Sequence, residues 1–248
     1  MALATRALAL GAARGSAVAV LARFWLGRLL LEGIELLALP GLALHHCARK
    51  AWLWRRLPDG ATTERQLLWL GVGFDGLGRA LVASGSDVRV IETDHPDTLR
   101  QRRALVADDR IEMKALQLPG DLQALASICA ARPTTIICEG MLMYLPKQTV
   151  VRALRTLAAL PEPPRLIFTV LDTLQPGGRG FHRSAPTVRR WLERQGEPFR
   201  WRCSPTRVQC CLAAAGYEVT ELWDGEGFGE YAIEATPSVP QRNTRSRW

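Results

Sequence analysis

The sequence has little cysteine, and none of it is spaced to bind a metal. Only six of the 248 residues are cysteines, and no two of them form a C-x-x-C pair. This pattern argues against a zinc site and against a disulfide framework, and it is typical of a protein kept in a reducing compartment. We therefore expect a cytoplasmic protein without a bound metal.

Acidic residues are missing from the first 31 positions, which superficially resembles a targeting peptide. A long apolar run is missing there too, because Arg14, Arg23 and Arg28 interrupt the segment well short of the roughly 20 residues that span a bilayer. No small-residue cleavage site follows a compact apolar core. We interpret residues 1–60 as an N-terminal helical cap on the main domain. Helices that contact a membrane surface are the alternative.

The net charge is compatible with several classes of binding partner. The formal charge is +8 and the isoelectric point about 9.7. These values suit an acidic substrate, a membrane surface or a nucleic acid, and they also follow from arginine-rich composition alone. An N/D-P-P-Y/F signature and interleaved aromatic residues are both absent, so the sequence disfavours a nucleic acid as the partner.

From residue 66 onward, short apolar runs alternate with segments of helical spacing. The β-branched runs that end in glycine or acids predict strands, and the runs that end at glycine with 3.6-residue spacing predict helices. We expect strands over residues 66–71, 87–94, 111–118, 134–140 and 164–172, and helices over 77–85, 120–131 and 147–160.

This alternation predicts an α/β fold with a doubly wound, mostly parallel sheet, whose ligand lies beyond the carboxyl ends of the strands. After residue 172 the alternation stops, and a loop rich in glycine and proline leads into helices over 187–195 and 205–215. Two closing strands follow over 217–224 and 231–236. We expect the domain to occupy residues 61–236 and residues 237–248 to form a disordered tail.

The stretch "LGVGFDGLG", residues 70–78, has G-x-G-x-x-G spacing after a strand. Such a loop usually holds a pyrophosphate on backbone N–H groups, but Asp75 inside it would repel that anion. S-adenosylmethionine (SAM) carries an ammonium and a sulfonium group, and a nearby carboxylate does not repel these positive charges. The loop therefore favours SAM over a nicotinamide cofactor, and Asp75 capping the next helix is the other interpretation of that residue.

Glu92 and Asp94 end the second strand. They are two residues apart, so both side chains point to the same face of an extended segment. This is the place where ribose hydroxyls are held in nucleotide-binding folds. Both SAM and dinucleotide sites use such an acid, so the pair supports a nucleotide fold without choosing the nucleotide.

The motifs "LGVGFDGLG", "IETDHP" and "EGMLMYLP" together resemble those of the leucine carboxyl methyltransferase family, which are class I SAM-dependent methyltransferases. The late stretch "GEPFRWRCSPTRVQCCLAAAGYEV" is also similar to the usual ending of the family. The resemblance extends over about residues 40–219. It implies a Rossmann-like methyltransferase fold with a seven-stranded sheet, and SAM as the cofactor.

The resemblance also implies roles for individual residues. Gly71 and Gly73 would approach the cofactor closely, and Asp94 would bind the ribose with Glu92 beside it. Glu139 would lie against the methionine amine. In "HHCARK", Arg49 would bind the methionine carboxylate, since its planar fork suits a carboxylate better than the ammonium of the following lysine.

The chain departs from the family at the adenine position. The family usually has Asp-Leu after the third strand, where the acid accepts a hydrogen bond from the adenine amino group, and this chain has Gln117. A glutamine oxygen still accepts such a bond. Tyr144, in the motif after the fourth strand, is the residue that we expect to contact the substrate, with packing as the alternative.

The leading hypothesis is a SAM-dependent O-methyltransferase that forms a methyl ester on a carboxylate of a small molecule or peptide. A carboxylate is already ionised at pH 7, so His182, which we expect to be solvated, is not needed as a base. The arginines between residues 179 and 207 predict a solvated face or, alternatively, a basic rim that attracts an acidic substrate. Alternative functions are methylation of a nucleic acid or a hydroxyl, or SAM binding without catalysis.

Overall fold

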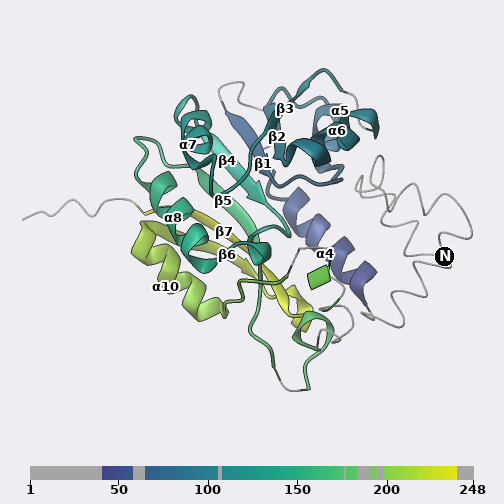
Figure 1. Ribbon diagram of the computed structural model, residues 1–248, viewed down its shortest axis with the longest axis vertical. Coiled ribbons are helices and arrows are strands. Elements are labelled where there is room, and N and C mark those ends of the chain that lie inside the picture. Colours follow the sequence, from purple (N-terminus) through teal and green to yellow (C-terminus); the bar gives the residue numbers. More distant parts are fainter. Residues whose placement is uncertain are drawn as a thin grey trace, which may run out of the picture.

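The computed structural model describes residues 41–57, 65–105, 108–175, 177–183, 190, 193–194 and 198–238. Its centre is one seven-stranded sheet with helices on both faces (Figure 1). Most of the expected N-terminal cap, almost all of the tail after residue 236 and most of the expected helix over 187–195 lie outside the described residues. In the part that the structure describes, no helix has the length and apolar character needed to cross a bilayer.

The sheet confirms the predicted fold class. Its strand order is β3-β2-β1-β4-β5-β7-β6, in which the first five strands are parallel and β7 pairs antiparallel with both β5 and β6. The strands are β1 (Gln66–Leu70), β2 (Arg89–Asp94), β3 (Ile111–Ala115), β4 (Thr134–Cys138), β5 (Arg165–Leu171), β6 (Tyr217–Trp223) and β7 (Glu230–Pro237).

Six helices flank the sheet within the described residues. The set comprises α4 (Leu42–Trp54), α5 (Leu77–Ala83), α6 (Pro96–Leu105), α7 (Leu122–Ala130), α8 (Lys147–Ala158) and α10 (Pro205–Ala215). Short 3-10 turns are η1 (Leu142–Tyr144), η2 (Gly180–Arg183) and η3 (Gly225–Gly227). Helices α4, α5 and α6 contribute to one apolar cluster, and α7, α8 and α10 to the other.

Strand β1 illustrates why the sequence forms two clusters. Successive side chains of a strand point to opposite faces, and all five residues of β1 are buried. Leu67 and Trp69 pack with α4 and α5, whereas Leu68 and Leu70 pack with α7 and α8. A continuous apolar run is therefore what a central parallel strand requires, since helices cover both of its faces.

The pattern of strands and helices in the sequence did not predict helix α6. This helix carries Arg102, which bonds to the end of β2 and to the glycine loop. The guanidinium of Arg102 forms two hydrogen bonds with Glu92, of 2.7 Å and 2.6 Å, and both side chains are fully buried. A third bond of 3.2 Å reaches the carbonyl of Gly73. Arg102 therefore connects the end of β2 to the glycine loop on the buried side of the loop.

This pairing changes the interpretation of Glu92. The expectation that Glu92 lies on an open face beside Asp94 is wrong, because its side chain has no exposed surface and both oxygens bond to Arg102. A buried carboxylate is stable only when a partner compensates its charge. Glu92 supports the site from the core of the domain.

Replacing Arg102 by methionine should lower the free energy of unfolding by about 3–5 kcal/mol, because it leaves the Glu92 carboxylate buried without a partner. The double variant Glu92→Met/Arg102→Met should lose much less, since it removes both charges. Urea denaturation of both variants gives the comparison. If the single and double variants lost equal free energy of unfolding, an unpaired Glu92 carboxylate would not be the cause of the loss.

Candidate functional site

The glycine loop after β1 is fixed to the end of β2 by its own backbone. The N–H groups of Gly71 and Val72 both donate to the carbonyl of Thr93, at 2.9 Å and 3.0 Å. The N–H of Gly73 donates to the carboxylate of Asp94 at 2.7 Å. Gly71 and Gly73 have φ values of +72° and +52°, which favour glycine. The predicted glycines and Asp94 therefore meet at one edge of the sheet.

Two glycines at this edge border open space. A Cβ added at Gly73 or Gly140 would meet no atom within 4 Å, whereas one at Gly71 would lie 2.6 Å from the sulfur of Met141. Gly73 follows β1 and Gly140 follows β4, so the space lies between the two strands where the sheet order reverses. Ligands of doubly wound folds bind at this switch point.

Each carboxylate oxygen of Asp75 has a partner within the protein. One oxygen accepts the N–H of Leu77 at 2.7 Å, which caps the start of α5. The other oxygen pairs with the ammonium of Lys50 on α4. The residue therefore bonds to the start of α5, as one interpretation predicted, and also links the glycine loop to α4.

A cluster of five charged side chains lies at the carboxyl edge of the sheet, and we call it the charge cluster. Lys50 bridges Asp75 and Glu139, and Arg49 bridges Glu139, at 2.7 Å, and Glu230. It holds two cations and three carboxylates. Arg49 and Lys50 belong to α4, Asp75 to the glycine loop, Glu139 follows β4 and Glu230 opens β7, so four parts of the chain contribute. Its members are Arg49, Lys50, Asp75, Glu139 and Glu230.

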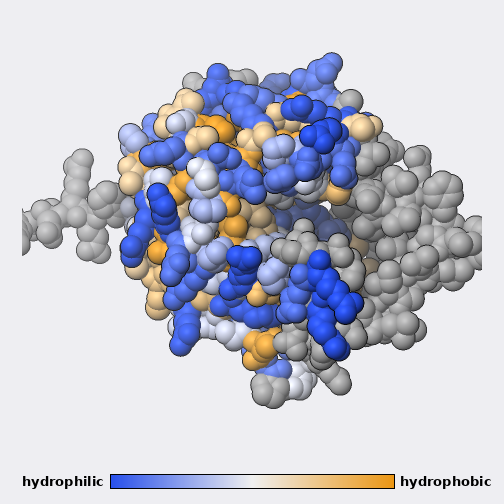
Figure 2. All heavy atoms as spheres, viewed as in Figure 1, coloured by the Kyte–Doolittle hydropathy of each residue, from blue (hydrophilic) through white to orange (hydrophobic). Residues whose placement is uncertain are grey.

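Lys50 enters the site together with Arg49, although the sequence favoured Arg49 over the lysine that follows it. The side chain of Lys50 is 5% exposed and that of Arg49 13% exposed. Both residues occupy the same turn of α4 and both enter the cluster. The space-filling view is hollowed near the position of α4, and the floor of the hollow is hydrophilic (Figure 2).

Pairing with cations lowers the pKa of two carboxylates of the cluster, Glu139 and Glu230. Burial would raise the pKa of Glu139, but Lys50 and Arg49 hold it far below its ordinary value. Burial likewise opposes ionisation of Glu230, and Arg49 with His45 lowers the pKa of that carboxyl. Burial of Asp75 outweighs its pairing, so the pKa of Asp75 is raised.

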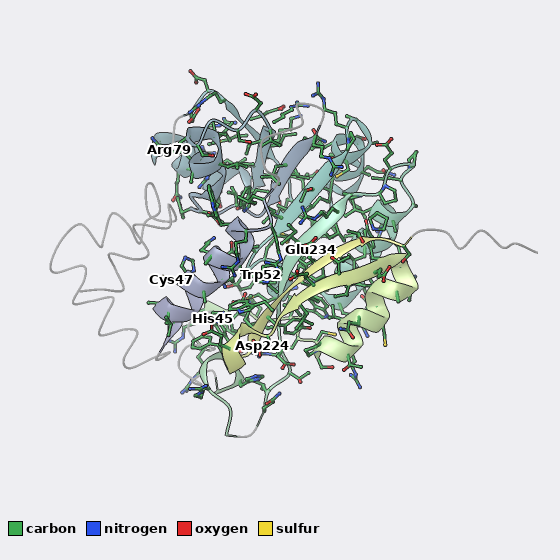
Figure 3. All side chains as sticks on the ribbon, turned by 180° about the vertical axis from the view of Figure 1, so that it is seen from behind. His45, Cys47, Trp52, Arg79, Asp224 and Glu234 are labelled. Carbon is green, nitrogen blue, oxygen red and sulfur yellow. The ribbon has the colours of Figure 1, made fainter. Side chains whose placement is uncertain are left out.

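Glu230, like Lys50, is a member of the cluster that sequence reasoning did not assign to the site. It is fully buried and accepts a hydrogen bond of 2.9 Å from the ring of His45. Figure 3 shows His45 on α4, near the turn that carries Asp224, with Trp52 further along the same helix. An acid at the first position of a mostly apolar strand was the available signal, but the sequence does not reveal which cation lies opposite it.

Gln117 and Tyr144 lie at the periphery of this edge. Gln117 is exposed after β3, and its N–H donates to Asp121 at 2.7 Å. Tyr144 is half-buried in η1, and its ring stacks on that of Phe199 with centroids 5.7 Å apart. Neither belongs to the charge cluster.

His182 is not solvated, contrary to expectation. It is 9% exposed, with Nδ1 3.0 Å from the carbonyl of Thr173 and Nε2 3.8 Å from the carboxylate of Asp172. Its backbone and ring fill the space beside Gly178 and Gly229, where an added Cβ would clash with it. The histidine holds the loop after β5 against the start of β7.

The arginines after residue 178 are of two kinds. Arg179, Arg200 and Arg207 are exposed, as a solvated face or a basic rim would require. Arg202 is half-buried and donates to the carbonyls of Asp172 and Phe181. Among the described residues, no group of three or more His, Cys, Asp and Glu side chains is arranged to hold a metal ion.

His46 gives the site a measurable pH response. Burial, then the charges of Arg49 and Lys50, lower its pKa from 6.5 to about 3, and its Nδ1 lies 3.0 Å from Arg49. Between pH 6.5 and pH 3 the unfolded chain therefore binds a proton at His46 that the folded protein does not, so stability falls as the pH drops. The loss is at most about 1.4 kcal/mol per pH unit.

We expect the free energy of unfolding to fall by about 1–2 kcal/mol more between pH 6.5 and pH 5 in the natural protein than in His46→Gln. Glutamine keeps a polar group near Arg49 and does not titrate. Urea denaturation at the two pH values measures the difference. Parallel pH profiles would show that His46 is protonated as readily in the folded protein as in the unfolded chain.

Several solved structures share this fold. LepI, solved in complex with SAM, matches with a TM-score of 0.53 and 13% identity over 75% of this chain and 46% of LepI, so the chain spans about half the length of LepI. Magnesium protoporphyrin IX methyltransferase (ChlM) from Synechocystis PCC 6803, with bound SAH, matches with a TM-score of 0.53 and 15% identity, over 79% of this chain and 85% of ChlM.

Mitomycin 7-O-methyltransferase MmcR matches with a TM-score of 0.50 and 16% identity, over 79% of this chain and 57% of MmcR. At these identities the three structures establish the fold. No curated protein matches the chain by sequence. The family model of the leucine carboxyl methyltransferases matches residues 36–158, which include α4, the glycine loop, Asp94 and Glu139. Through this segment, which is just under half of the chain, the protein is similar to the leucine carboxyl methyltransferase family.

Proposed function

We propose that the protein is a SAM-dependent O-methyltransferase that forms a methyl ester on a carboxylate of a small molecule or peptide. The observation that carries the proposal is the charge cluster beside the open space at Gly73 and Gly140, in a chain similar to this family. LepI was solved with SAM and ChlM with SAH, which supports SAM as the cofactor.

The residues at this edge suit the chemical groups of SAM. Asp94 would bind the ribose hydroxyls, and Gly73, which borders open space, would let the cofactor approach the loop closely. At Gly71 the side chain of Met141 occupies the corresponding space, so we assign the close approach to Gly73 alone. Glu139 and Asp75 would accept hydrogen bonds from the methionine ammonium, since both carboxylates already bond to the ammonium of Lys50. This proposal assigns Glu92 no contact with the cofactor.

The methionine carboxylate would bind the cations of α4. Arg49 is our choice because its planar guanidinium forms paired hydrogen bonds, and Lys50 lies close enough to share the role. Gln117 would accept a hydrogen bond from the adenine amino group. Arg49 and Lys50 carry two positive charges against three carboxylates, so the bound cofactor's sulfonium meets surroundings with an excess of negative charge.

The transfer needs little from the protein beyond alignment. When bound, SAM supplies a methyl group on a positively charged sulfur. A carboxylate oxygen of the acceptor would attack this carbon, so that one C–O bond forms, the C–S bond breaks and the electron pair stays on sulfur. The acceptor is already ionised at neutral pH, so the protein has only to remove water from it and orient it. No proton transfer is required, and His182 has no part in the step.

Calorimetry should show that the protein binds SAM and does not bind NAD. Arg49→Ala and Lys50→Ala should each weaken SAM binding about 10-fold or more, because a hydrogen bond to a charged group contributes about 1.5–3 kcal/mol. Arg155→Ala, on the last turn of α8, is the matched control and should bind SAM normally. Micromolar binding of NAD without a response to SAM would overturn the cofactor assignment.

The labelled product should release methanol in mild alkali, as a methyl ester does. A hydroxyl acceptor, with a pKa near 10, would need a base or a metal, and loss of that group would slow the reaction about 100-fold or more. We therefore expect His182→Asn to keep most of the activity and a chelator to have no effect. A methyl group that survives alkali would place the enzyme in the hydroxyl or amine class and leave the cofactor assignment standing.

A further inference from the structure

Aromatic rings form a continuous row that begins at the charge cluster, and we call it the aromatic row. The ring of Phe228 stacks on His45 with centroids 4.5 Å apart, and Phe181 meets Phe228 edge to face at 5.4 Å. Phe199 meets Phe181 edge to face at 6.4 Å and stacks on Tyr144 at 5.7 Å. In order, the row consists of His45, Phe228, Phe181, Phe199 and Tyr144.

Backbone contacts hold the row together. The N–H of Phe181 donates to the carbonyl of Phe228 at 2.6 Å. The N–H groups of Arg200 and Trp201 both donate to the carbonyl of Met143, at 2.7 Å and 3.1 Å, which keeps Phe199 beside η1. Rings from four separate segments are thus brought to one edge of the sheet by main-chain bonds.

Both ends of the row are connected to segments of the proposed cofactor site. At the inner end, His45 bonds to Glu230, which pairs with Arg49. At the outer end, Tyr144 lies in the turn that begins shortly after Glu139. A molecule held along the row would therefore lie beside the cofactor.

Exposure changes along the row. His45 and Phe228 are buried, with 3% and 8% exposed, whereas Phe181, Phe199 and Tyr144 are only half-buried. The inner rings thus belong to the core, and the three outer rings retain accessible surface. Partly exposed rings that pack on each other offer flat apolar surface, which prefers another π system in stacked or edge-to-face contact.

Positive charge accompanies the outer rings. The guanidinium carbon of Arg202 lies 5.4 Å from the centroid of Phe199, and the side chains of Arg179 and Arg200 are exposed nearby in the chain. Arginines at this position favour an anion at the edge of a bound ring. An aliphatic acid would satisfy the charge but leave the ring surfaces without a matching partner.

We propose that the methyl acceptor is a planar aromatic carboxylic acid, whose ring packs against Phe181, Phe199 and Tyr144 and whose carboxylate is turned toward the cofactor. This inference rests on the proposed function and adds the class of acceptor to it. Phe199 is its central residue, because it contacts both neighbouring rings and lies under Arg202. Each ring contact favours an aromatic ligand by about threefold, so two contacts give about tenfold.

The test compares two acids of the same charge and carbon skeleton, 2-naphthoate and decahydro-2-naphthoate. Calorimetry with the full chain saturated with SAH, the demethylated product, measures binding to each acid. We expect 2-naphthoate to bind about 10-fold more tightly than its saturated analogue. Phe199→Leu and Tyr144→Leu, which keep apolar volume but remove a ring, should each reduce this preference to about threefold or less.

Trp54→Leu is the matched control, because Trp54 is an exposed aromatic residue of α4 outside the row. It should keep the full preference, and thermal unfolding checks that all three variants are folded. Equal binding of the two acids, or no binding of either, in a protein that binds SAH would overturn the inference and leave the proposed function intact. A protein that fails to bind SAH would overturn both.

Discussion

The pairing of buried charges at the carboxyl edge of the sheet is the constraint on which the rest of the site depends. Arg49 and Lys50 enter from α4, and each would be costly to bury alone. Asp75, Glu139 and Glu230 compensate them from three other segments. The glycine loop, the turn after β4 and the start of β7 must therefore all be correctly placed before α4 can pack on the sheet.

The same requirement explains why the family match and the fold agree. The matched segment, residues 36–158, contains α4, the glycine loop and Glu139, and these provide four of the five members of the charge cluster. The remaining member, Glu230, lies in β7 outside that segment. The charged residues of these segments thus pair with residues of other segments.

The architecture of the sheet could be predicted from the sequence because it depends on local patterns. Apolar runs that end in glycine or acids mark the parallel strands, and helical spacing marks most of the helices between them. Asp94 and the glycines were predictable for the same reason, since their places follow from the ends of β1 and β2. Helix α6 was missed because its first turn follows the strand directly and its sequence, with few apolar residues, has weak periodicity.

The partners of the charged residues could not be predicted, because pairing is decided by the tertiary fold. The sequence favoured Arg49 over Lys50, and only the packing of α4 shows that Lys50 is buried between two carboxylates. Glu92 was assigned to the open face by its spacing from Asp94, but Arg102 of the unrecognised helix draws it into the core. Burial of an ion pair leaves no local signature in the sequence.

The antiparallel insertion of β7 between β5 and β6 has a consequence for how the molecule assembles. Because β7 runs opposite to β5, its first residue, Glu230, lies beside the last residue of β5, at the edge where the parallel strands end. One partner of Arg49, Glu230, is therefore 181 positions later in the chain. During synthesis the parallel strands emerge long before that partner, and contacts between such distant positions close slowly. The charge cluster is complete only after almost the whole domain has been made, so a ribosome-bound chain that already contains every residue of the family motifs still lacks Glu230, the fifth member of the cluster.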